Sequence, residues 1–288
     1  MHDKRGKHAL RGLRWAGCVR RLADSRWGST CWGKSWRQLH SPTLFEIGKA
    51  LQPNSKHWPK SIDVRAATGI VNELEVVRNR FLATEEAVER LDLGAGSRRR
   101  TRGESGVRVA DLARRSLTPK ADLEAFCRWL QLVAPVGRRG RFLELGTSLG
   151  LTSAGVAMLG WEVQTWEGCP KTLELANTAW KELGLSGKID DREGDFRILV
   201  NQLKRGEEFD VVFLDGLHEE QATLDLASAL EPRVRTCLVV DDISWSPGMN
   251  RAWNALQDEP AWRVSFTWRG RGFLFKAPHM ARERFRLA

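Results

Sequence analysis

Acidic residues end several apolar runs in the second half of the chain, where carboxylates could bind ligands or accept protons. Asp215 ends "VVFLD", and Asp241 and Asp242 follow "TCLVV". Clustered carboxylates repel one another unless a positive charge lies among them, and oxygen ligands suit Mg²⁺. The pattern therefore predicts a divalent metal site at Asp215, Asp241 and Asp242. The competing interpretation is that these acids bind an organic cofactor or cap helices.

A histidine three residues beyond Asp215 adds a candidate for proton transfer. A neutral imidazole can accept a proton from a hydroxyl nucleophile at cellular pH. We therefore predict His218 as a general base, with Asp215 as the second catalytic residue. The alternative is that His218 caps the helical segment "EEQATLDLASAL" that follows it.

A glycine-rich stretch nearer the middle of the chain has the spacing of a nucleotide-binding turn. "LELGTSLGLTS" runs from Leu143 to Ser153, after the apolar run "RFLEL" and at the start of the small-residue segment "LTSAGVAML". Glu167 ends the next apolar run, 21 residues after Gly146, as such turns require. A similar string, "LDLGAGSRRR" from Leu91 to Arg100, lacks both flanking elements.

The spacing of the glycines discriminates between ligands. A dinucleotide fingerprint would place glycines at 146, 148 and 151, but the chain has Ser148 and Leu151, and its next glycine is Gly150. This difference disfavours a nicotinamide-dependent oxidoreductase. Because Gly146 and Gly150 have no Cβ, we predict that their backbone approaches a ligand closely.

Strands and helices must position these residues. From Gly140, short apolar runs alternate with amphipathic segments, which predicts an α/β fold with a doubly wound, mostly parallel sheet of seven strands and helices on both faces. The segment "WRVSFTWRGRGFLFK" is typical of a hairpin, so the last strand should be antiparallel. Residues 39–136 are predicted as a helical N-terminal section that forms part of a substrate lid, with Thr118 as a helix cap.

Together these features resemble the motifs of class I S-adenosylmethionine-dependent methyltransferases. The resemblance covers residues 140–276, nearly half of the chain. It implies that Glu167 bonds both ribose hydroxyls, that Asp195 in "EGDF" contacts the adenine amine, and that Asp215 lies beside the methionine part. Glu144 would accept from the ammonium of the ligand. The implied cofactor is S-adenosylmethionine, and the implied binding residues are Glu144, Gly146, Thr147, Ser148, Gly150, Glu167, Asp195 and Asp215.

Three segments, "FLELGTSLG", "DVVFLDGLH" and "VVDDISWS", resemble a group of bacterial methyltransferases, and their layout resembles the catechol-type O-methyltransferases. The catechol-type enzymes use a metal, so the resemblance implies Mg²⁺ at the three acids. The chain departs from their pattern, because an Asp-Asp pair replaces Asp-Asn and His218 stands where they have lysine. The bacterial group also shares segments like "HSPT" at 40–43 and "GAGS" at 94–97, which implies a lid or entrance element at the second of these.

Composition limits the class of protein. The chain has 288 residues and is 42% hydrophobic, and no apolar run approaches the roughly 20 residues of a membrane helix. Its five cysteines are scattered without zinc spacing, as in proteins of a reducing compartment. We therefore predict a cytoplasmic protein with no membrane partner. Residues 137–276 are predicted to form the cofactor-binding domain, and 277–288 a C-terminal tail.

The formal charge of +10 is concentrated at the start of the chain. Residues 1–40 hold ten basic residues against two acidic ones. We predict that residues 1–38 form a flexible basic arm. Three interpretations compete: a solvated extension, an organelle-targeting segment, and an arm that touches nucleic acid.

The sequence thus predicts a methyltransferase that methylates an oxygen of a small molecule by in-line transfer. The alternative is an RNA-binding protein or RNA methyltransferase that uses the basic arm. In that case, aromatic side chains between the charges would stack on bases. The arm offers Trp15, Trp27, Trp32 and Trp36 for this role, and the loop at 98–102 adds further arginines.

Overall fold

The computed structural model describes residues 42–52, 58–89 and 106–287, all of which belong to the unit Lys34–Ala288. The predictions for the basic arm, for His40 and Ser41, and for the loop that holds Gly94–Ser97 and the arginines at 98–102 fall outside these residues. The RNA-binding alternative depends on that arm and loop, so it stays a prediction.

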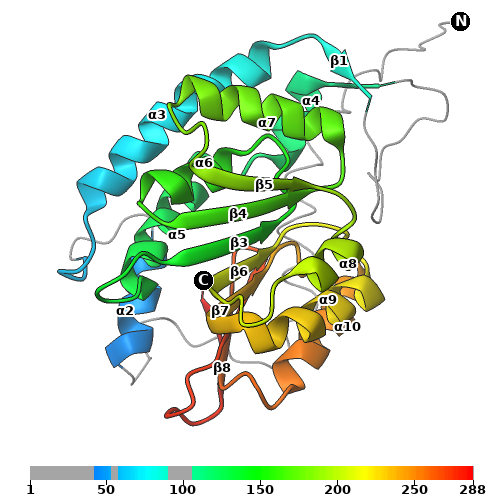
Figure 1. The fold of residues 1–288 in the computed structure, drawn as a ribbon. Helices are drawn as coiled ribbons and strands as arrows, with labels where there is room; N and C mark the ends of the chain where they lie inside the picture. Colours follow the sequence, from blue (N-terminus) through cyan, green and yellow to red (C-terminus); the bar gives the residue numbers. More distant parts are fainter. Residues whose placement is uncertain (1–41, 53–57, 90–105, 288) are drawn as a thin grey trace, which may run out of the picture. The chain divides into compact units, whose positions relative to one another are not determined.

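An eight-stranded sheet forms the centre of the described unit (Figure 1). Its strand order is β10-β8-β9-β7-β6-β3-β4-β5. All neighbouring strands are parallel except at β9, which is antiparallel to both β7 and β8. The strands are β3 (Arg141–Leu145), β4 (Glu162–Glu167), β5 (Ile189–Glu193), β6 (Phe209–Leu214), β7 (Val234–Val240), β8 (Val264–Trp268), β9 (Arg271–Phe275) and β10 (Glu283–Leu287). A separate two-stranded ribbon pairs β1 (Ala87–Val88) with β2 (Val107–Arg108).

The predicted α/β class with a mostly parallel sheet is confirmed, but the strand count is not. The eighth strand, β10, comes from the segment 277–288 that was predicted as a tail, and it pairs in parallel with β8. The antiparallel strand is thus the seventh, and the last strand is parallel to its neighbour. In β10 the buried Phe285 and Leu287 alternate with charged residues. Because only two apolar residues carry this alternation, the sequence gives too weak a strand signal there.

Helices cover both faces of the sheet, as predicted. In chain order, the described helices are α2 (Pro42–Leu51), α3 (Val64–Ala83), α4 (Val109–Ser116), α5 (Lys120–Val133), α6 (Leu151–Met158), α7 (Pro170–Glu182), α8 (Phe196–Leu199), α9 (Glu220–Leu230) and α10 (Pro247–Asp258). Short 3₁₀ helices follow α8 and α9 at Val200–Gln202 and Glu231–Arg233. None of the helices in the described part of the chain is both long and apolar enough to cross a membrane.

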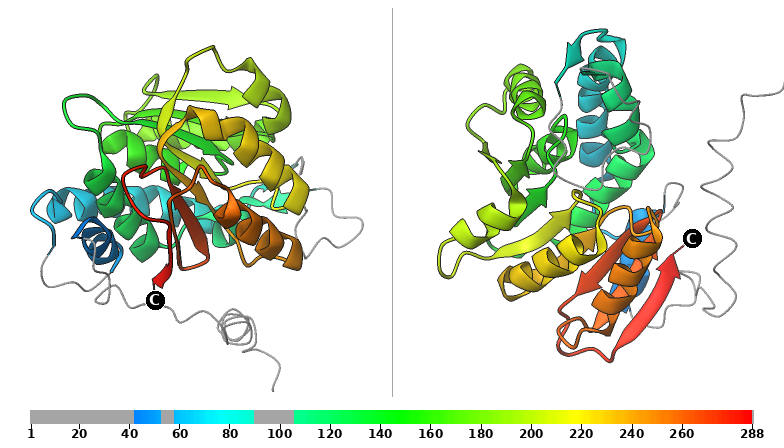
Figure 2. Two further views of the ribbon diagram at one scale, coloured as in Figure 1. Left: turned by 90° about the horizontal axis from the view of Figure 1, so that it is seen from below. Right: turned by 90° about the vertical axis from the view of Figure 1, so that its right-hand side faces the viewer.

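Two hydrophobic layers result from the alternation of side chains along the strands. Phe142 and Phe213 face the layer that also contains the buried sides of α3, α5, α6 and α7. Leu143 and Val212 face the opposite layer, with α8, α9 and α10. The blue-to-green helices and the yellow-to-orange helices lie on opposite faces of the sheet in Figures 1 and 2.

The N-terminal helices are part of this core. On α5, Phe126 lies 5.6 Å from Phe213 and 6.3 Å from Phe142 between ring centroids. The helix α5 therefore covers the sheet and helps to form the main hydrophobic layer. The connection between α4 and α5 reaches the strand ends discussed below through Thr118, whose hydroxyl contacts Arg271.

The start of α5 corrects one prediction. Thr118 does not cap the helix: Pro119 is in the N-cap position, and no side chain caps this end. The Thr118 hydroxyl instead accepts a hydrogen bond from Arg271 at 2.9 Å. The local sequence predicts a cap because Thr118 directly precedes Pro119. It gives no sign of the true partner of Thr118, which is 153 residues away along the chain.

Candidate active site

Four strand ends place the predicted site residues in one row. Leu145 of β3 is in register with Trp166 of β4 and with Leu214 of β6, which is in register with Val240 of β7. The next residue of each strand is therefore Gly146, Glu167, Asp215 or Asp241. The chain leaves β3 toward β4 on one side and returns through β6 on the other. Ligands of doubly wound sheets bind at such a switch point, beside the carboxyl ends of the strands.

The glycine turn is tight because it packs against protein atoms. Gly146 has a φ of +109°, and a Cβ there would lie 2.1 Å from the carbonyl oxygen of Asp215. Gly150 has a φ of +73°, and a Cβ there would lie 2.6 Å from the indole nitrogen of Trp180. That nitrogen donates a hydrogen bond to the Gly150 carbonyl at 2.8 Å. Neighbouring protein atoms thus explain both glycines, and a close approach of a ligand to their backbone stays a prediction.

Glu167 is bonded to the glycine turn. Its carboxylate accepts from the backbone N–H of Ser148 at 2.8 Å and from that of Cys169 at 3.0 Å. The side chain of Thr147, between Gly146 and Ser148, is buried and is 2.7 Å from the hydroxyl of Thr165. The turn and the carboxylate therefore lie in direct contact at one place in the molecule.

Asp195 lies beyond the end of β5 and begins the short helix α8. Its carboxylate accepts from the backbone N–H of Arg197 and from the guanidinium of the same residue, each at 2.9 Å. The hydrogen bond from the Arg197 side chain lowers the pKa of Asp195. The carboxylate is thus held ionised at the outer end of the row.

Glu144 lies behind the turn. Its side chain is 1% exposed and accepts hydrogen bonds from Ser153 and, at 2.8 Å, from Thr165. Burial raises the pKa of Glu144 to about 7, although these two hydrogen bonds act in the opposite direction. These contacts support a role in shaping the turn, and differ from the predicted contact with a ligand ammonium.

The raised pKa of Glu144 predicts a loss of stability with rising pH. A carboxyl whose pKa is raised by folding stabilises the fold fully at pH values below its pKa in the unfolded chain, near 4.5. This stabilisation disappears as the pH rises through its pKa in the folded protein, about 7. Ionisation of Glu144 should therefore cost about 3 kcal/mol of unfolding free energy. The measurement is urea unfolding of the wild type and of Glu144→Gln at several pH values from about 5 to 8.5. The wild type should lose stability relative to the variant across this range, and parallel curves would contradict the assignment.

His218 lies in a strained segment after β6. Its Nε2 is 3.9 Å from Oδ1 of Asp215, and its ring lies 6.1 Å from that of Trp245. Leu217 and His218 both have positive φ, at 63° and 44°. Burial, followed by the charge of Asp241, raises the pKa of Asp215, while Arg271 opposes the shift. The structure therefore brings the two predicted catalytic residues together.

Backbone strain is concentrated along this row. Within the described residues, five non-glycine residues have positive φ, and four of them follow β3, β6 or β7 at their carboxyl ends. These four are Ser148, Leu217, His218 and Asp242. Such conformations cost of order 1–3 kcal/mol each and persist where the surroundings fix them, which is common at functional sites. The strain thus marks the same residues as the sequence motifs do.

The three acids are not arranged as the predicted metal site. Among the described residues, no three His, Cys, Asp or Glu side chains are grouped so that they could hold a metal ion. Asp241 instead accepts from Arg271 Nε at 3.0 Å with one oxygen and from the Asp242 backbone N–H at 2.7 Å with the other. The positive charge that the acids require therefore comes from an arginine.

Three contacts join residues 116–122, from the end of α4 to the start of α5, to this region, and sequence reasoning missed all of them. Ser116 and Ser148 are 2.7 Å apart between their hydroxyl oxygens. Thr118 bonds Arg271, and Asp122 pairs with Arg269, which is in the β8–β9 turn. The two arginines belong to "RGRG", in the middle of the segment that is predicted only as a hairpin. No local pattern indicates such partners, because they are 32, 153 and 147 residues apart along the chain.

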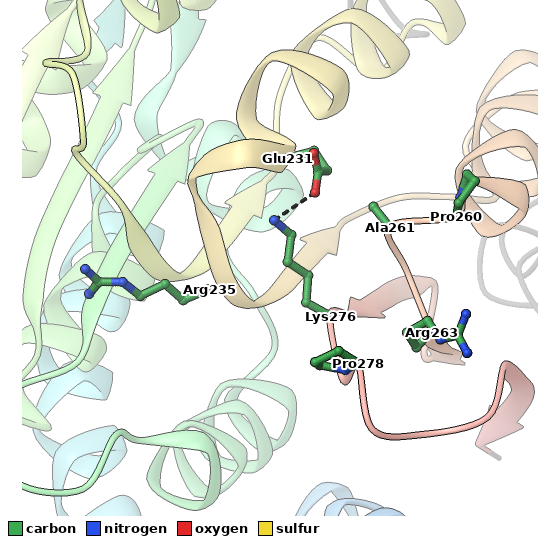
Figure 3. A pocket seen from close by; sticks show the side chains of 7 residues that line it. All are labelled: Glu231, Arg235, Pro260, Ala261, Arg263, Lys276 and Pro278. Atoms are coloured by element: carbon green, nitrogen blue, oxygen red, sulfur yellow. Dashed lines mark ion pairs between the residues drawn. The ribbon is translucent and has the colours of Figure 1, made fainter.

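An open pocket elsewhere does not belong to the row of strand ends (Figure 3). It lies at the opposite end of β7, and its lining residues are Glu231, Arg235, Pro260, Ala261, Arg263, Lys276 and Pro278. Lys276 pairs with Glu231 at 2.7 Å, and Arg235 pairs with Glu208 at 2.8 Å. Since Lys276 and Arg235 already have acidic partners and Arg263 donates to the Met280 carbonyl oxygen, we assign no function to this pocket.

Comparison with known proteins gives limited matches. No protein-family model matches the sequence. An O-methyltransferase of Aspergillus hancockii, hkm8, is 28% identical over 121 residues, which is 41% of this chain and 47% of that protein. The chain thus spans about half the length of the curated relative that it matches, and over this part it is similar to an O-methyltransferase.

Solved structures with a similar arrangement also include O-methyltransferases. One is an O-methyltransferase from Bacillus cereus in complex with SAH, with a TM-score of 0.47, 18% identity, and coverage of 56% of this chain and 82% of that one. Another is TomG from Streptomyces achromogenes, involved in tomaymycin synthesis and crystallised with SAM, with a TM-score of 0.48, 17% identity, and coverage of 56% and 82%.

Proposed function

We propose that this chain is a class I S-adenosylmethionine-dependent methyltransferase that methylates an oxygen of a small molecule. The observation that carries the proposal is the contact between the glycine turn and Glu167 at the switch point of the sheet. A single ligand at that point can meet both elements, because Ser148 N–H and the Glu167 carboxylate are 2.8 Å apart. The similarity to an O-methyltransferase supports the same reaction.

The acids of the row suit an adenosine-bearing ligand. A carboxylate only accepts hydrogen bonds, so Glu167 can receive both hydroxyls of a ribose. Asp195, one strand further out, would accept from an adenine amine. Asp215, on the other side of the turn, would accept from the ammonium end of the ligand. The donors of the ligand would thus meet acceptors that follow β4, β5 and β6.

The chemistry requires a proton acceptor more than a strong positive charge. S-adenosylmethionine supplies a methyl group on a positive sulfonium: as the oxygen–carbon bond forms, the sulfur–carbon bond breaks and the sulfur becomes neutral. His218 would take the proton of the acceptor hydroxyl on Nδ1, while Asp215 would hold the imidazole through Nε2, which lies 3.9 Å from its Oδ1. Most of the rate gain would come from aligning the hydroxyl with the methyl carbon.

Replacement of His218 tests this role. We expect His218→Asn to lower turnover by about 100-fold, because general-base catalysis typically contributes that much or more. Release of S-adenosylhomocysteine would be measured against a panel of phenolic and catecholic acceptors. His279→Asn serves as the control, because His279 is exposed and lies at the other end of the sheet. An equal rate for wild type and His218→Asn would exclude His218 as the base.

Isothermal titration with S-adenosylmethionine, S-adenosylhomocysteine and NAD tests the proposed function itself. We expect the first two to bind the full chain at a single site and NAD to give no heat of binding. Binding of NAD, or of none of the three, would overturn the proposal.

A further inference from the structure

The candidate site contains a buried arginine that the proposed reaction does not use. Arg271 is the first residue of β9, and its side chain is 7% exposed. A buried guanidinium is costly unless charged and polar partners surround it. Its position therefore needs an explanation in terms of the groups that it contacts.

Those groups are the acids of the predicted metal site. Arg271 Nε donates to Asp241 at 3.0 Å, and its second nitrogen donates to Thr118 Oγ1 at 2.9 Å. Its guanidinium carbon lies 5.4 Å and 5.7 Å from the ring centroids of Phe213 and Phe126. Burial acts to lower the pKa of Arg271, but Asp241 and Asp215 outweigh it and raise the pKa above its ordinary value. The guanidinium is thus held in place and permanently charged.

A divalent ion at the three acids would have to compete with this charge. Both oxygens of Asp241 already accept from N–H donors, one of them from Arg271. An ion bound there would displace the guanidinium from its partner and leave it buried beside another positive charge. The residues present therefore do not fit the Mg²⁺ that the family resemblance implies.

We propose that Arg271 is the fixed cation of this site and that it takes the place of a divalent metal, so that the cofactor binds and methyl transfer proceeds without a metal. This inference rests on the proposed function. Arg271 is a positioning residue: it neutralises Asp241 and ties the α4–α5 connection to the end of β7. The acceptor proton then passes to a protein base, for which His218 is the candidate.

The first test uses the wild-type chain. Its thermal midpoint and its affinity for S-adenosylhomocysteine would be measured after treatment with EDTA and again with millimolar Mg²⁺. We expect neither to change. A tenfold gain in affinity with Mg²⁺, or a rise in Tm that saturates with Mg²⁺, would overturn the proposal.

The second test removes the charge. Arg271→Met keeps the length of the side chain, and we expect its Tm to fall by about 10 °C, because it leaves buried carboxylates without a cation. Mg²⁺ should now raise the Tm of this variant, and the double variant Arg271→Met with Asp241→Asn should recover at least half of the loss. Arg269→Met is the matched control: its partly exposed pair with Asp122 should matter little. An unchanged Tm for Arg271→Met would contradict the proposal.

Two further outcomes are decided by the same design. If Arg271→Met does not fold, Arg271→Lys keeps the charge, and it should fold with a smaller loss of Tm and no response to Mg²⁺. If the wild type binds no S-adenosylhomocysteine with or without Mg²⁺, the proposed function fails. Recovery in the double variant would then still show that Arg271 neutralises the acids.

Discussion

Replacement of Glu167 by alanine is expected to lower the affinity for S-adenosylmethionine by about 100-fold or more. Hydrogen bonds to charged groups are worth about 1.5–3 kcal/mol each, and two lost bonds to ribose hydroxyls amount to at least 3 kcal/mol. In the wild type, the Glu167 carboxylate accepts hydrogen bonds from the backbone N–H groups of Ser148 and Cys169, and the variant loses both bonds. The turn would therefore lose a support as well as a ligand contact.

A residue of the same strand provides the control for this experiment. Glu162 begins β4 at the opposite end, its side chain is 58% exposed, and its carboxylate lies 3.6 Å from Arg141 Nε. Glu162→Ala should bind S-adenosylmethionine as the wild type does when both are titrated calorimetrically. Equal affinity of Glu167→Ala and the wild type would show that the ligand lies elsewhere.

Replacement of Gly146 by alanine should destabilise the protein by about 3–5 kcal/mol. The new Cβ would lie 2.1 Å from the Asp215 carbonyl oxygen and 2.7 Å from its carbon. These are backbone atoms that join β6 to β3, since Asp215 N–H donates to Leu145 at 2.8 Å. Neither strand can move without breaking that pairing, so the cost cannot be relieved locally.

A second glycine separates the steric clash from the strain of positive φ. Gly160 has a φ of +86°, and a Cβ there would meet nothing within 4 Å. Gly160→Ala should therefore cost only about 1–2 kcal/mol, the penalty for the left-handed conformation. The two variants would be compared by urea unfolding. If they lost equal stability, close packing of the turn on Asp215 would not be the reason for Gly146.

The glycine turn and Glu167 could be located from the sequence because the signal is local. A strand, a turn and a helix follow one another within about 20 residues, and the periodicity of each is clear. Asp215 and His218 are positioned by the same rule, since the ends of parallel strands lie along one edge. The strain at Leu217, His218 and Asp242 could not be predicted, because it depends on how those loops pack in the folded molecule.

The role of Arg271 could not be read from the sequence for a related reason. Its partners are Asp241, 30 residues away, and Thr118, 153 residues away. The acids alone suggested a metal because a cation was needed and none was near in sequence. Thr118 similarly suggested a helix cap. In both cases the true partner is Arg271, which is distant in sequence, whereas the spacing implied a metal ion for the acids and a helix N-terminus for Thr118.

The two outer strands of the sheet are the most charged ones. One edge is β5, "IDDRE", and the other is β10, "ERFRL", whereas the inner strands β6 and β7 are "FDVVFL" and "VRTCLVV". An edge strand exposes unpaired backbone groups that invite pairing with another chain, and charged side chains discourage it. Neither border of this sheet should therefore accept a strand from a second molecule. Removal of β10 would leave β8, with Phe266 and Trp268, as an uncharged edge strand that is far more prone to pair with another chain.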